Sequence, residues 1–446
     1  MGSSEPNVVL IVMDTTRADF LSCYGYPQAT SPAIDRLAEE GVRYTRAFST
    51  CYWTLPSHAT LFSGLYPTEA GATSVSNRLP AKVNTLAELL GARGYHTVGA
   101  ATNPWITRER GFQQGFEEFE ETWRTAPERQ AYDAAAEHAA TWIRRFSESG
   151  RPFFLFVNLN SPHLPYSPPP EALEAVTTQP ISDDALTRLS GIRGAWRHFA
   201  GQLELGQEDF TSLRSLYAAE IRQADRHVGR IVSALTEEGI LDDTLVIVTS
   251  DHGENIGEHG MIDHVFSMFD TTLHVPLIVR FPERFGSGEV VDELVSLVDV
   301  APTILDVCGV PGDDRRLHVE RTSLCSAGRV PRSFVVAEND RPVNGIAVLR
   351  EKYPWVDTDA LDHPMQAIRS DRHKLVWDGR GVSGLYDLTV DPDETQNLAG
   401  VRPEIEDALM SLLDTWRSTL TPGDAVRLES GDAEAAERLR ALGYVE

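Results

Sequence analysis

Short apolar runs that alternate with stretches of helical periodicity are the feature that most constrains how this chain folds. Five runs are typical of buried strands: residues 7–13 (NVVLIVM), 96–101 (HTVGAA), 152–159 (PFFLFVNL), 244–250 (TLVIVTS) and 276–281 (PLIVRF). Helical patterns separate them at 31–41, 85–94, 130–148 and 208–239. Strands that alternate with helices predict an α/β fold, in which a largely parallel sheet is sandwiched between helices.

The chain is also long enough for more than one structural unit. Its 446 residues exceed the usual size of a single domain. The alternation of strands and helices loosens after residue 310, so we expect a main domain over residues 1–325 and a smaller α+β subdomain over 326–446. The polar segment 171–207 has no clear periodicity, and we predict an irregular insertion that borders a pocket.

The charge of the chain excludes some partners. With 66 acidic and 40 basic residues, the formal net charge is −26, which repels nucleic acids and anionic membranes. Nearly all basic residues are arginine, because lysine occurs only at positions 82, 352 and 374. Such a surface favours a halophilic protein, since concentrated salt screens its self-repulsion. The alternative is an ordinary acidic protein from a GC-rich genome.

The cysteines and the N-terminal stretch bear on the cellular compartment. The four cysteines are scattered and form no CxxC pair, so we expect no disulfide framework. The residues before Asp14 include no basic region and no long apolar run, and no apolar run in the chain approaches 18 residues. We therefore expect a cytoplasmic protein with no signal peptide and no membrane span.

Polar side chains follow several of the predicted strands. Asp14 follows the first strand directly, Asp251 and His252 follow the fourth, and His163 lies just past the third. In sheets of this kind, ligands bind beyond the carboxyl ends of the strands, where these side chains should meet. Aspartate with histidine suits Mn²⁺, Zn²⁺, Mg²⁺ or Ca²⁺. The alternative is a loop cap with solvated charges.

Thr54 lies where a helix is expected to begin. It stands two residues before Pro56, and proline is favoured in the first turn of a helix. At a helix N-terminus the free N–H groups stabilise negative charge, such as an alkoxide or a bound oxyanion. A metal ion could activate the threonine hydroxyl by lowering its pKa. The structural alternative is that Thr54 serves only as the N-cap of this helix.

These residues carry a resemblance to a known family. Over nearly its full length the chain resembles the sulfatase branch of the alkaline phosphatase superfamily. The similar pieces, in the order found in that family, are NVVLIVMDTTRADFLSCYGY, SPAIDRLAEEGVRYTRAFS, TLPSHATLFSGLYP, PFFLFVNLNSPHLPY, TSDHGENIGEHG, HVFSMFDTTLHVPLIVRFP, DVAPTILDVCG and GLYDLTVDPDETQNLA. The resemblance implies an alkaline-phosphatase-like mixed, mostly parallel sheet and a sulfatase-like catalytic domain over residues 1–325.

The resemblance also implies the residues of the site. Sulfatases carry the signature Cys/Ser-x-Pro-Ser-Arg, whose first residue is oxidised to formylglycine, and Thr54 occupies that slot here. Cys51 is out of register with the signature and is expected to be a buried apolar residue. Threonine is not a known precursor of formylglycine, so Thr54 looks like a direct nucleophile. The implied ligands of one divalent ion (Mn, Zn, Ca or Mg) are Asp14, Thr54, Asp251 and His252, and the implied catalytic residues are Thr54, His58, His163 and His264.

The chain also departs from the family pattern. The double aspartate of sulfatases after the first strand is Asp14-Thr15 here, and Asn103 occupies the region of the family's Lys-x-His element. In the resemblance, His58 replaces the signature arginine, His163 contacts the ester oxygens and His264 faces the leaving group. We expect His259 and His274 to be structural, and Arg17 to contact Asp14 without binding the metal itself.

The sequence therefore predicts a metal-dependent hydrolase of sulfate esters or related phosphate-type esters. Its partner would be a small-molecule or glycan ester, and neither nucleic acid nor a membrane. Within the enzyme class, a phosphodiesterase, a phosphonate monoester hydrolase or a head-group transferase are the alternatives. Outside it, a catalytically inactive binding protein with the same fold remains open.

Overall fold

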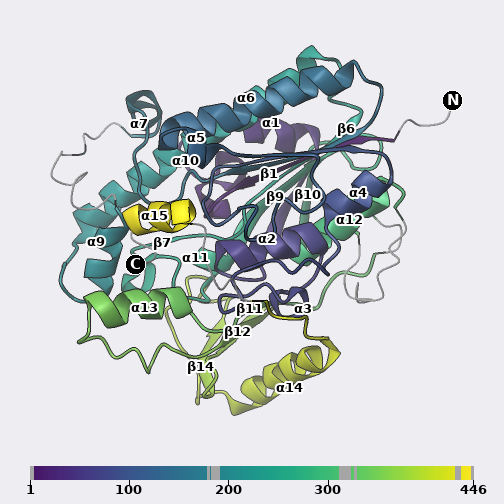
Figure 1. Ribbon diagram of the computed structural model, residues 1–446. Helices are drawn as coiled ribbons and strands as arrows, with labels where there is room; N and C mark the ends of the chain where they lie inside the picture. The colour runs from purple at the N-terminus through teal and green to yellow at the C-terminus, as the bar shows by residue number, and fades with distance from the viewer. Residues whose placement is uncertain are drawn as a thin grey trace.

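A large central sheet with helices on both faces organises the chain. The computed structural model describes residues 5–177, 181, 191–310, 323–325, 329–426 and 433–442. Within these ranges the central sheet has eight strands, and a smaller four-stranded sheet lies toward the C-terminus (Figure 1). The α/β sandwich with a mostly parallel sheet and a C-terminal α+β part is therefore confirmed.

The strands of the central sheet follow the buried apolar runs of the sequence. Their spatial order is β10 (Glu289–Ser296), β2 (Val42–Phe48), β9 (His274–Arg280), β6 (Thr244–Thr249), β1 (Asn7–Met13), β5 (Phe153–Leu159), β3 (His96–Ala101) and β4 (Glu118–Glu121). Every neighbouring pair is parallel except those of β9, which runs antiparallel to both β2 and β6. The central strand β1 is almost fully buried, as a strand covered on both faces must be.

The reversed direction of β9 determines the path of the connection that joins β6 to β9. Strand β6 ends at the carboxyl edge of the sheet, and β9 begins at that same edge because it runs the opposite way. Residues 250–273, which join the two strands, include only short elements: β7 (Asn255–Ile256), β8 (Ile262–Asp263), α11 (Asp270–Leu273) and one 3₁₀ turn. The whole connection can therefore stay at the edge where ligands bind.

Two layers of helices cover the central sheet (Figure 1). One layer consists of α1 (Pro32–Glu40), α6 (Glu128–Ser147) and α10 (Gln207–Glu237), and the other of α2 (Thr54–Ser63), α4 (Leu86–Ala92) and α12 (Val300–Val307). The helix predicted over residues 208–239 forms α10. Its apolar face buries Leu213, Tyr217, Ile221, Val228, Ile231 and Leu235, whereas Phe210 is half-buried. Short helices α3 (Pro67–Ala70) and α5 (Thr122–Thr125) complete the large unit.

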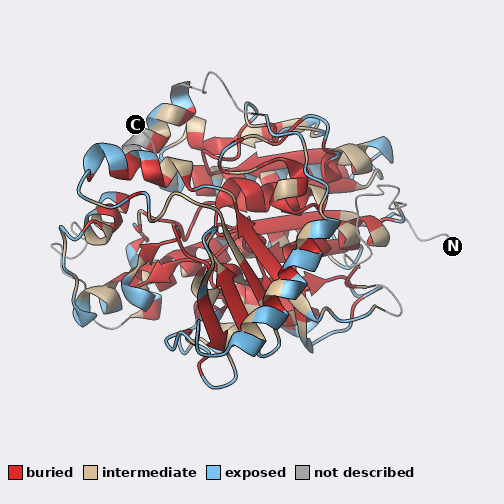
Figure 2. Cartoon of the chain, turned by 90° about the horizontal axis from the view of Figure 1, so that it is seen from below, coloured by how far each residue is buried: buried red, intermediate tan, exposed pale blue. Residues whose placement is uncertain are grey.

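The C-terminal part forms an antiparallel sheet. Its strands are β11 (Phe334–Asn339), β12 (Met365–Ser370), β13 (His373–Trp377) and β14 (Val382–Asp387). The C-terminal helices are α13 (Val343–Lys352), α14 (Pro403–Thr419) and α15 (Ala433–Leu442), of which α13 and α15 bury their apolar residues in the core of the large unit. Helix α14 packs on this sheet through Leu409, Leu413 and Trp416, while its outer side is exposed (Figure 2). The predicted boundary at 325/326 adjoins residues outside the described ranges, so it stays a prediction.

The predicted insertion at 171–207 is more regular than expected. Helices α7 (Pro170–Val176) and α9 (Ile192–Phe199) lie in or overlap it, so the prediction of an irregular segment is wrong there. Helix α9 buries Ile192, Ala195 and Trp196 on one side, while Arg193 and Arg197 interrupt this apolar pattern in the sequence. Residues 178–180 and 182–190 lie outside the described ranges. No helix among the described residues is long and apolar enough to span a bilayer.

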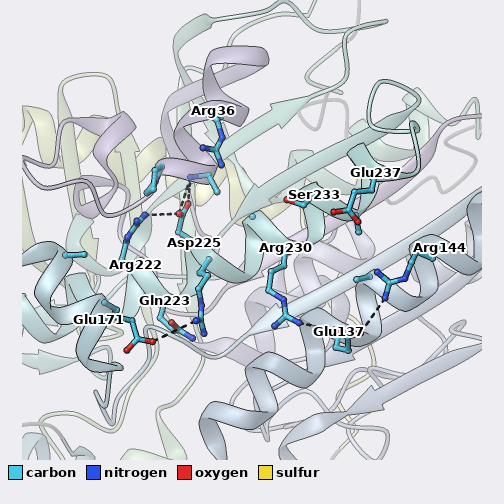
Figure 3. Close-up of a pocket in the computed structure, with 18 residues that line it drawn as sticks. Arg36, Glu137, Arg144, Glu171, Arg222, Gln223, Asp225, Arg230, Ser233 and Glu237 are labelled. Atoms are coloured by element: carbon cyan, nitrogen blue, oxygen red, sulfur yellow. Dashed lines mark hydrogen bonds and ion pairs between the residues drawn. The ribbon is translucent and has the colours of Figure 1, made fainter.

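A charged groove of about 830 Å³ lies between α1, α6, α7 and α10 (Figure 3). Several of its arginines pair with acidic neighbours: Arg230 lies 2.9 Å from Glu137, and Arg222 lies 3.5 Å from Asp225. Asp225 also accepts hydrogen bonds from the first backbone N–H groups of α1. None of the predicted site residues lines this groove, so it is separate from the predicted active site.

Candidate active site

The residues that follow the strands converge at the carboxyl edge of the central sheet. Asp14 follows β1, and Asp251 follows β6, which pairs with β1. The Nε2 atom of His252 lies 3.4 Å from Asp251 Oδ2, 3.9 Å from Asp14 Oδ1 and 3.3 Å from Thr54 Oγ1. These four side chains are at most 1% exposed. The structure therefore brings together all four residues predicted to be metal ligands.

The imidazole of His252 is oriented as a metal ligand requires. Its Nδ1 atom lies 3.0 Å from the carbonyl oxygen of Gly253, so Nδ1 carries the hydrogen that it donates there. The lone pair of Nε2 then faces the two carboxylates and the Thr54 hydroxyl. Burial, with the neighbouring His264, lowers the pKa of His252 well below its usual range, so the ring stays neutral.

Both carboxylates turn one oxygen toward this centre. The outer oxygens are held, because Asp14 Oδ2 accepts from Asn103 Nδ2 at 2.6 Å and Asp251 Oδ1 accepts from the backbone N–H groups of Thr15 and His252. Asp14 Oδ1 and Asp251 Oδ2 are buried and have no hydrogen-bond partner among the described residues. Unpaired buried oxygens are costly, and a bound cation would satisfy them.

Electrostatics supports the same conclusion. Burial and the charge of Asp251 raise the pKa of Asp14 well above its usual range. Two buried carboxylates cannot stay ionised side by side without a positive charge between them. Since Asp14, Asp251 and His252 can offer ligand atoms within 4.8 Å of one another, these residues fit a divalent cation.

Thr54 is the first residue of α2, and the position before it belongs to Trp53. The alternative role of Thr54 as the N-cap is therefore wrong: its hydroxyl faces His252 Nε2 and no capping hydrogen bond is made. The hydroxyl of Ser57 donates to the carbonyl oxygen of Asp251 at 2.6 Å, so the first turn of α2 is tied to the Asp251 loop. This contact fixes Thr54 relative to the metal ligands.

His58 lies behind Thr54, one helical turn further along α2. Its Nδ1 atom is 2.9 Å from the carbonyl oxygen of Thr54 and 3.4 Å from Asp251 Oδ2, and its Nε2 atom is 3.4 Å from Asn158 Nδ2. Burial lowers the pKa of His58, which keeps the ring neutral. Since both nitrogens have partners inside the protein, the geometry favours a supporting role for His58 over a proton-donating one.

His163 and His264 lie together next to His252. Their ring centroids are 5.1 Å apart, and the His264 ring is 4.4 Å from that of His252. Burial, with the charge of His264, lowers the pKa of His163 to about 3. Although burial also opposes protonation of His264, the carboxylates of Asp263 and Glu254 raise its pKa well above the usual range. One neutral and one cationic imidazole therefore border the site.

Two asparagines belong to the site although the sequence did not single them out as such. Asn103 holds Asp14, and Asn158 lies 3.5 Å from the same carboxylate oxygen and 3.4 Å from His58. A signal existed for each: Asn103 follows strand β3 at the ligand-binding edge, and Asn158 is a polar residue within the apolar run of β5.

The prediction that Arg17 partners Asp14 is wrong. Its guanidinium pairs with Asp19 at 2.7 Å and with Glu258 at 3.0 Å, and it donates to the carbonyl oxygen of Glu254. Asp14 is instead held by neutral amides, which leave its charge for a cation. Cys51 is fully buried, as expected of an apolar residue.

His259 and His274 make contacts away from the metal ligands. The His259 ring stacks on Phe269, with centroids 3.6 Å apart, and His274 Nε2 lies 2.8 Å from the carbonyl oxygen of Thr45. These contacts agree with the structural roles predicted for both.

A narrow, mostly apolar pocket adjoins the site. Its lining includes Trp53, Trp105, Trp196 and Val265. Trp53 precedes Thr54 and Val265 follows His264, so two of its walls are continuous with site residues. Trp196 belongs to α9, so the 171–207 segment borders a pocket as predicted.

The fold and site together define an α/β protein with a buried carboxylate–histidine centre at the carboxyl edge of its sheet. The family model described as Sulfatase matches residues 6–310, and the model described as N-sulphoglucosamine sulphohydrolase, C-terminal, matches residues 257–418. The chain therefore belongs to the sulfatase family, and it is a sulfuric ester hydrolase of that family.

Individual relatives agree with this family membership. The chain is 27% identical to the uncharacterized sulfatase YidJ of Escherichia coli (strain K12), over 92% of this chain and 88% of that protein. It is 25% identical to arylsulfatase K of Homo sapiens, over 90% and 80% of the two chains.

Solved structures show the same fold. The phosphonate monoester hydrolase of Agrobacterium radiobacter matches with a TM-score of 0.72 and 25% identity, over 93% of this chain and 95% of that chain. A structure determined with its substrate D-glucosamine-2-N,6-O-disulfate matches with a TM-score of 0.73 over 93% and 98% of the two chains. The latter is 20% identical and shows the fold alone.

Proposed function

We propose that this protein hydrolyses sulfate esters with Thr54 as a direct nucleophile, in place of the formylglycine of other sulfatases. The observation that carries the proposal is the position of the Thr54 hydroxyl, 3.3 Å from His252 Nε2 at the N-terminus of α2. A hydroxyl there meets the backbone N–H groups and dipole of the helix, which stabilise the negative charge that develops on attack.

Asp14, Thr54, Asp251 and His252 would hold one divalent cation. When bound, the cation would lower the pKa of the Thr54 hydroxyl and offset negative charge on the sulfate group. The two carboxylates supply ligand oxygens, Asn103 keeps Asp14 turned toward the centre, and His58 and Ser57 hold the first turn of α2 in register.

The reaction takes two steps on Thr54. First, Thr54 Oγ1 releases its proton to solvent and forms a bond to sulfur while the bond from sulfur to the ester oxygen breaks, and the departing alkoxide takes a proton from His264 to leave as the alcohol. Water then attacks the sulfur of the Thr54 ester, its oxygen stays in the released sulfate, and Thr54 regains its hydroxyl hydrogen. His264, which its two carboxylate neighbours keep protonated, is the proton donor in this proposal, and neutral His163 orients the ester oxygens.

A phosphonate or phosphate ester is the second candidate substrate. A direct hydroxyl nucleophile suits phosphorus as well as sulfur, and the phosphonate monoester hydrolase of Agrobacterium radiobacter is as similar to this chain as the sulfatases are. A head-group transferase would need an acceptor in place of water. An inactive binding protein is disfavoured, because the cluster of Asp14, Asp251, His252 and Thr54 is complete.

The apolar pocket supports a substrate with an uncharged ring next to the ester. Its named walls are indole rings and a valine, and its other lining residues, Tyr52, Ser74, Pro342, Asn344 and Gly345, carry no formal charge either. Indole faces stack on aromatic or sugar rings.

The test combines variants of Thr54 with a substrate comparison. Thr54→Ala should lower kcat by several orders of magnitude on p-nitrophenyl sulfate, because the nucleophile is lost, and Thr54→Ser should keep much of the activity. Intact-mass analysis of enzyme trapped during turnover should place one sulfuryl group on the peptide that contains Thr54. A fully active Thr54→Ala enzyme, or an aldehyde at Cys51, would refute the proposal.

Comparison of kcat/KM on p-nitrophenyl sulfate, phenyl phosphonate and bis-p-nitrophenyl phosphate decides between the candidates. The proposed function requires the sulfate to be the fastest of the three. A faster phosphonate or phosphodiester would transfer the same mechanism to phosphorus.

A further inference from the structure

A buried carboxylate with no part in the proposed reaction contacts the loop that carries His163. Glu220 lies on α10 and is 5% exposed. Its Oε2 atom accepts a hydrogen bond from the Ser161 hydroxyl at 2.8 Å, and its Oε1 atom accepts one from the backbone N–H of Ser167 at 2.6 Å. We propose that Glu220 is a positioning residue, which binds both sides of this loop and thereby holds His163 against the ester group of the substrate.

The loop has no regular structure of its own to hold His163. Residues 160–169, between β5 and α7, form neither helix nor strand. Ser161 and Ser167 stand on the two sides of His163 in the sequence, and both bind the same carboxylate. One side chain from a distant helix therefore joins the two sides of the loop.

The helix that supplies Glu220 is a firm support. Helix α10 packs its apolar side into the core of the large unit. One turn before Glu220, the hydroxyl of Tyr217 donates to the carbonyl oxygen of Thr15 at 2.6 Å. Because Thr15 directly follows Asp14, α10 holds both the chain next to a proposed metal ligand and the loop of His163.

The conformation of the loop also sets the direction of the His163 ring. The backbone N–H of His163 donates to the carbonyl oxygen of Asn160 at 2.8 Å, and its Nδ1 atom is in hydrogen-bond contact with the carbonyl oxygen of Leu164. The ring is therefore oriented by backbone groups of the loop itself. Since displacement of a catalytic group by about 1 Å can lower a rate about 100-fold, a loosened loop should impair catalysis.

A carboxylate suits this task because the loop presents two donors to it. Hydrogen bonds to a charged acceptor are about twice as strong as those between neutral groups. Leucine in place of Glu220 has a similar size but offers no acceptor to Ser161 or Ser167. Glutamine keeps a carbonyl oxygen for the Ser167 N–H, and its amide can donate to the Ser161 oxygen. The two substitutions therefore separate the hydrogen bonds from the size of the side chain.

Glu220 acts through another residue and is not itself catalytic. Both of its carboxylate oxygens already bind the loop. Its role therefore rests on the part that the proposed function gives to His163, and it does not depend on which group is the nucleophile. Evidence against Glu220 would accordingly leave the Thr54 mechanism standing.

The experiment measures kcat and KM of the full-length protein, with Mn²⁺ in the buffer, on the fastest of the three test esters. Glu220→Leu should lower kcat about 10–100-fold and change KM less, because His163 acts on the reacting ester group. Glu220→Gln should keep most of the activity, because it can still bind both serines. Glu237→Leu is the matched control, since Glu237 is exposed at the end of the same helix, and it should leave kcat unchanged.

A double variant separates positioning from general damage to the fold. His163→Ala removes the group that Glu220 holds, so Glu220→Leu in that background should lower kcat no further. Equal losses in the two backgrounds, or wild-type kcat in Glu220→Leu beside an impaired His163→Ala, would overturn the role of Glu220 alone. A fully active His163→Ala enzyme would overturn it together with the proposed role of His163.

Circular dichroism and the melting temperature show which variants fold. Ser161→Ala removes one of the two contacts by a small change, so it remains informative even where Glu220→Leu fails to fold. It should lower kcat in the wild-type background and leave kcat unchanged in the His163→Ala background. The same loss in both backgrounds, or no loss in either, would contradict the role of Glu220.

Discussion

The buried ion pairs of Lys374 allow a quantitative prediction about how the two parts of the chain are joined. Lys374, on β13, is 0% exposed, and its Nζ atom lies 2.7 Å from Asp270 Oδ1 and 2.7 Å from Glu394 Oε1. Asp270 belongs to α11 of the large unit, whereas Lys374 and Glu394 belong to the C-terminal part. The lysine is thus the positive charge between the half-buried Asp270 and the buried Glu394, two carboxylates that would otherwise repel each other.

Removal of this charge should be costly. Lys374→Met keeps the length of the side chain but leaves both carboxylates without their shared cation, and loss of one member of a buried ion pair costs about 3–5 kcal/mol. Arg369 lies 3.1 Å from Asp270 and compensates part of the loss, so we expect the lower end, about 3 kcal/mol. The measurement is the free energy of unfolding from urea denaturation.

Two further variants make this prediction sharp. Lys82→Met removes an exposed lysine that lies 2.7 Å from Asp424, and it should leave the urea midpoint unchanged because solvent screens that pair. Glu394→Gln in the Lys374→Met background should restore part of the lost stability, since one of the orphaned charges is gone. If Lys374→Met is no less stable than Lys82→Met, the account of a charge-balanced junction is wrong.

Three other predictions concern the site, the groove and the surface. Asn103→Leu should weaken metal affinity about 10–100-fold, because Asp14 loses the amide that orients it, and calorimetric Mn²⁺ titration that gave wild-type affinity would refute this. Burial raises the pKa of Asp225 to about 6. The protonated carboxyl therefore contributes its full stabilisation of the folded protein below about pH 4, and this contribution is lost as the pH rises through 6. Asp225→Asn should therefore gain up to about 3 kcal/mol relative to the wild type between pH 4 and 7 in urea denaturation, and a difference that does not vary with pH would contradict it. With a net charge of −26, the protein should melt at a higher temperature in molar KCl than at low ionic strength, and highest stability at low salt would refute the halophilic interpretation.

The layout of the sheet could be predicted because its strands are buried on both faces. Residues 8–13 and 245–248 are apolar throughout, and only strands of a covered sheet need that pattern. The reversed direction of β9 could not be predicted from its own residues, because parallel and antiparallel buried strands have the same composition. Helix α9 was missed because it has only eight residues and Arg193 and Arg197 interrupt its apolar pattern.

The clustering of the proposed metal ligands could be predicted because the ends of neighbouring parallel strands meet. Asp14 and Asp251 each follow a strand, so the fold alone brings them together. The direction of a side chain is a different matter. Arg17 follows Asp14 closely in sequence, yet its backbone turns it toward Asp19 and Glu258, and the partner of Asp14 comes from the distant Asn103.

The reversed strand β9 has a consequence for how this protein can change over evolution. Residues 250–273 leave and re-enter the sheet at one edge, so their length is not fixed by a crossover to the opposite edge. This one segment carries Asp251, His252, Glu254, Asp263 and His264. Insertions and substitutions after His252 could therefore remodel the candidate site, while the register of β6 and β9, and with it the stability of the scaffold, stays the same.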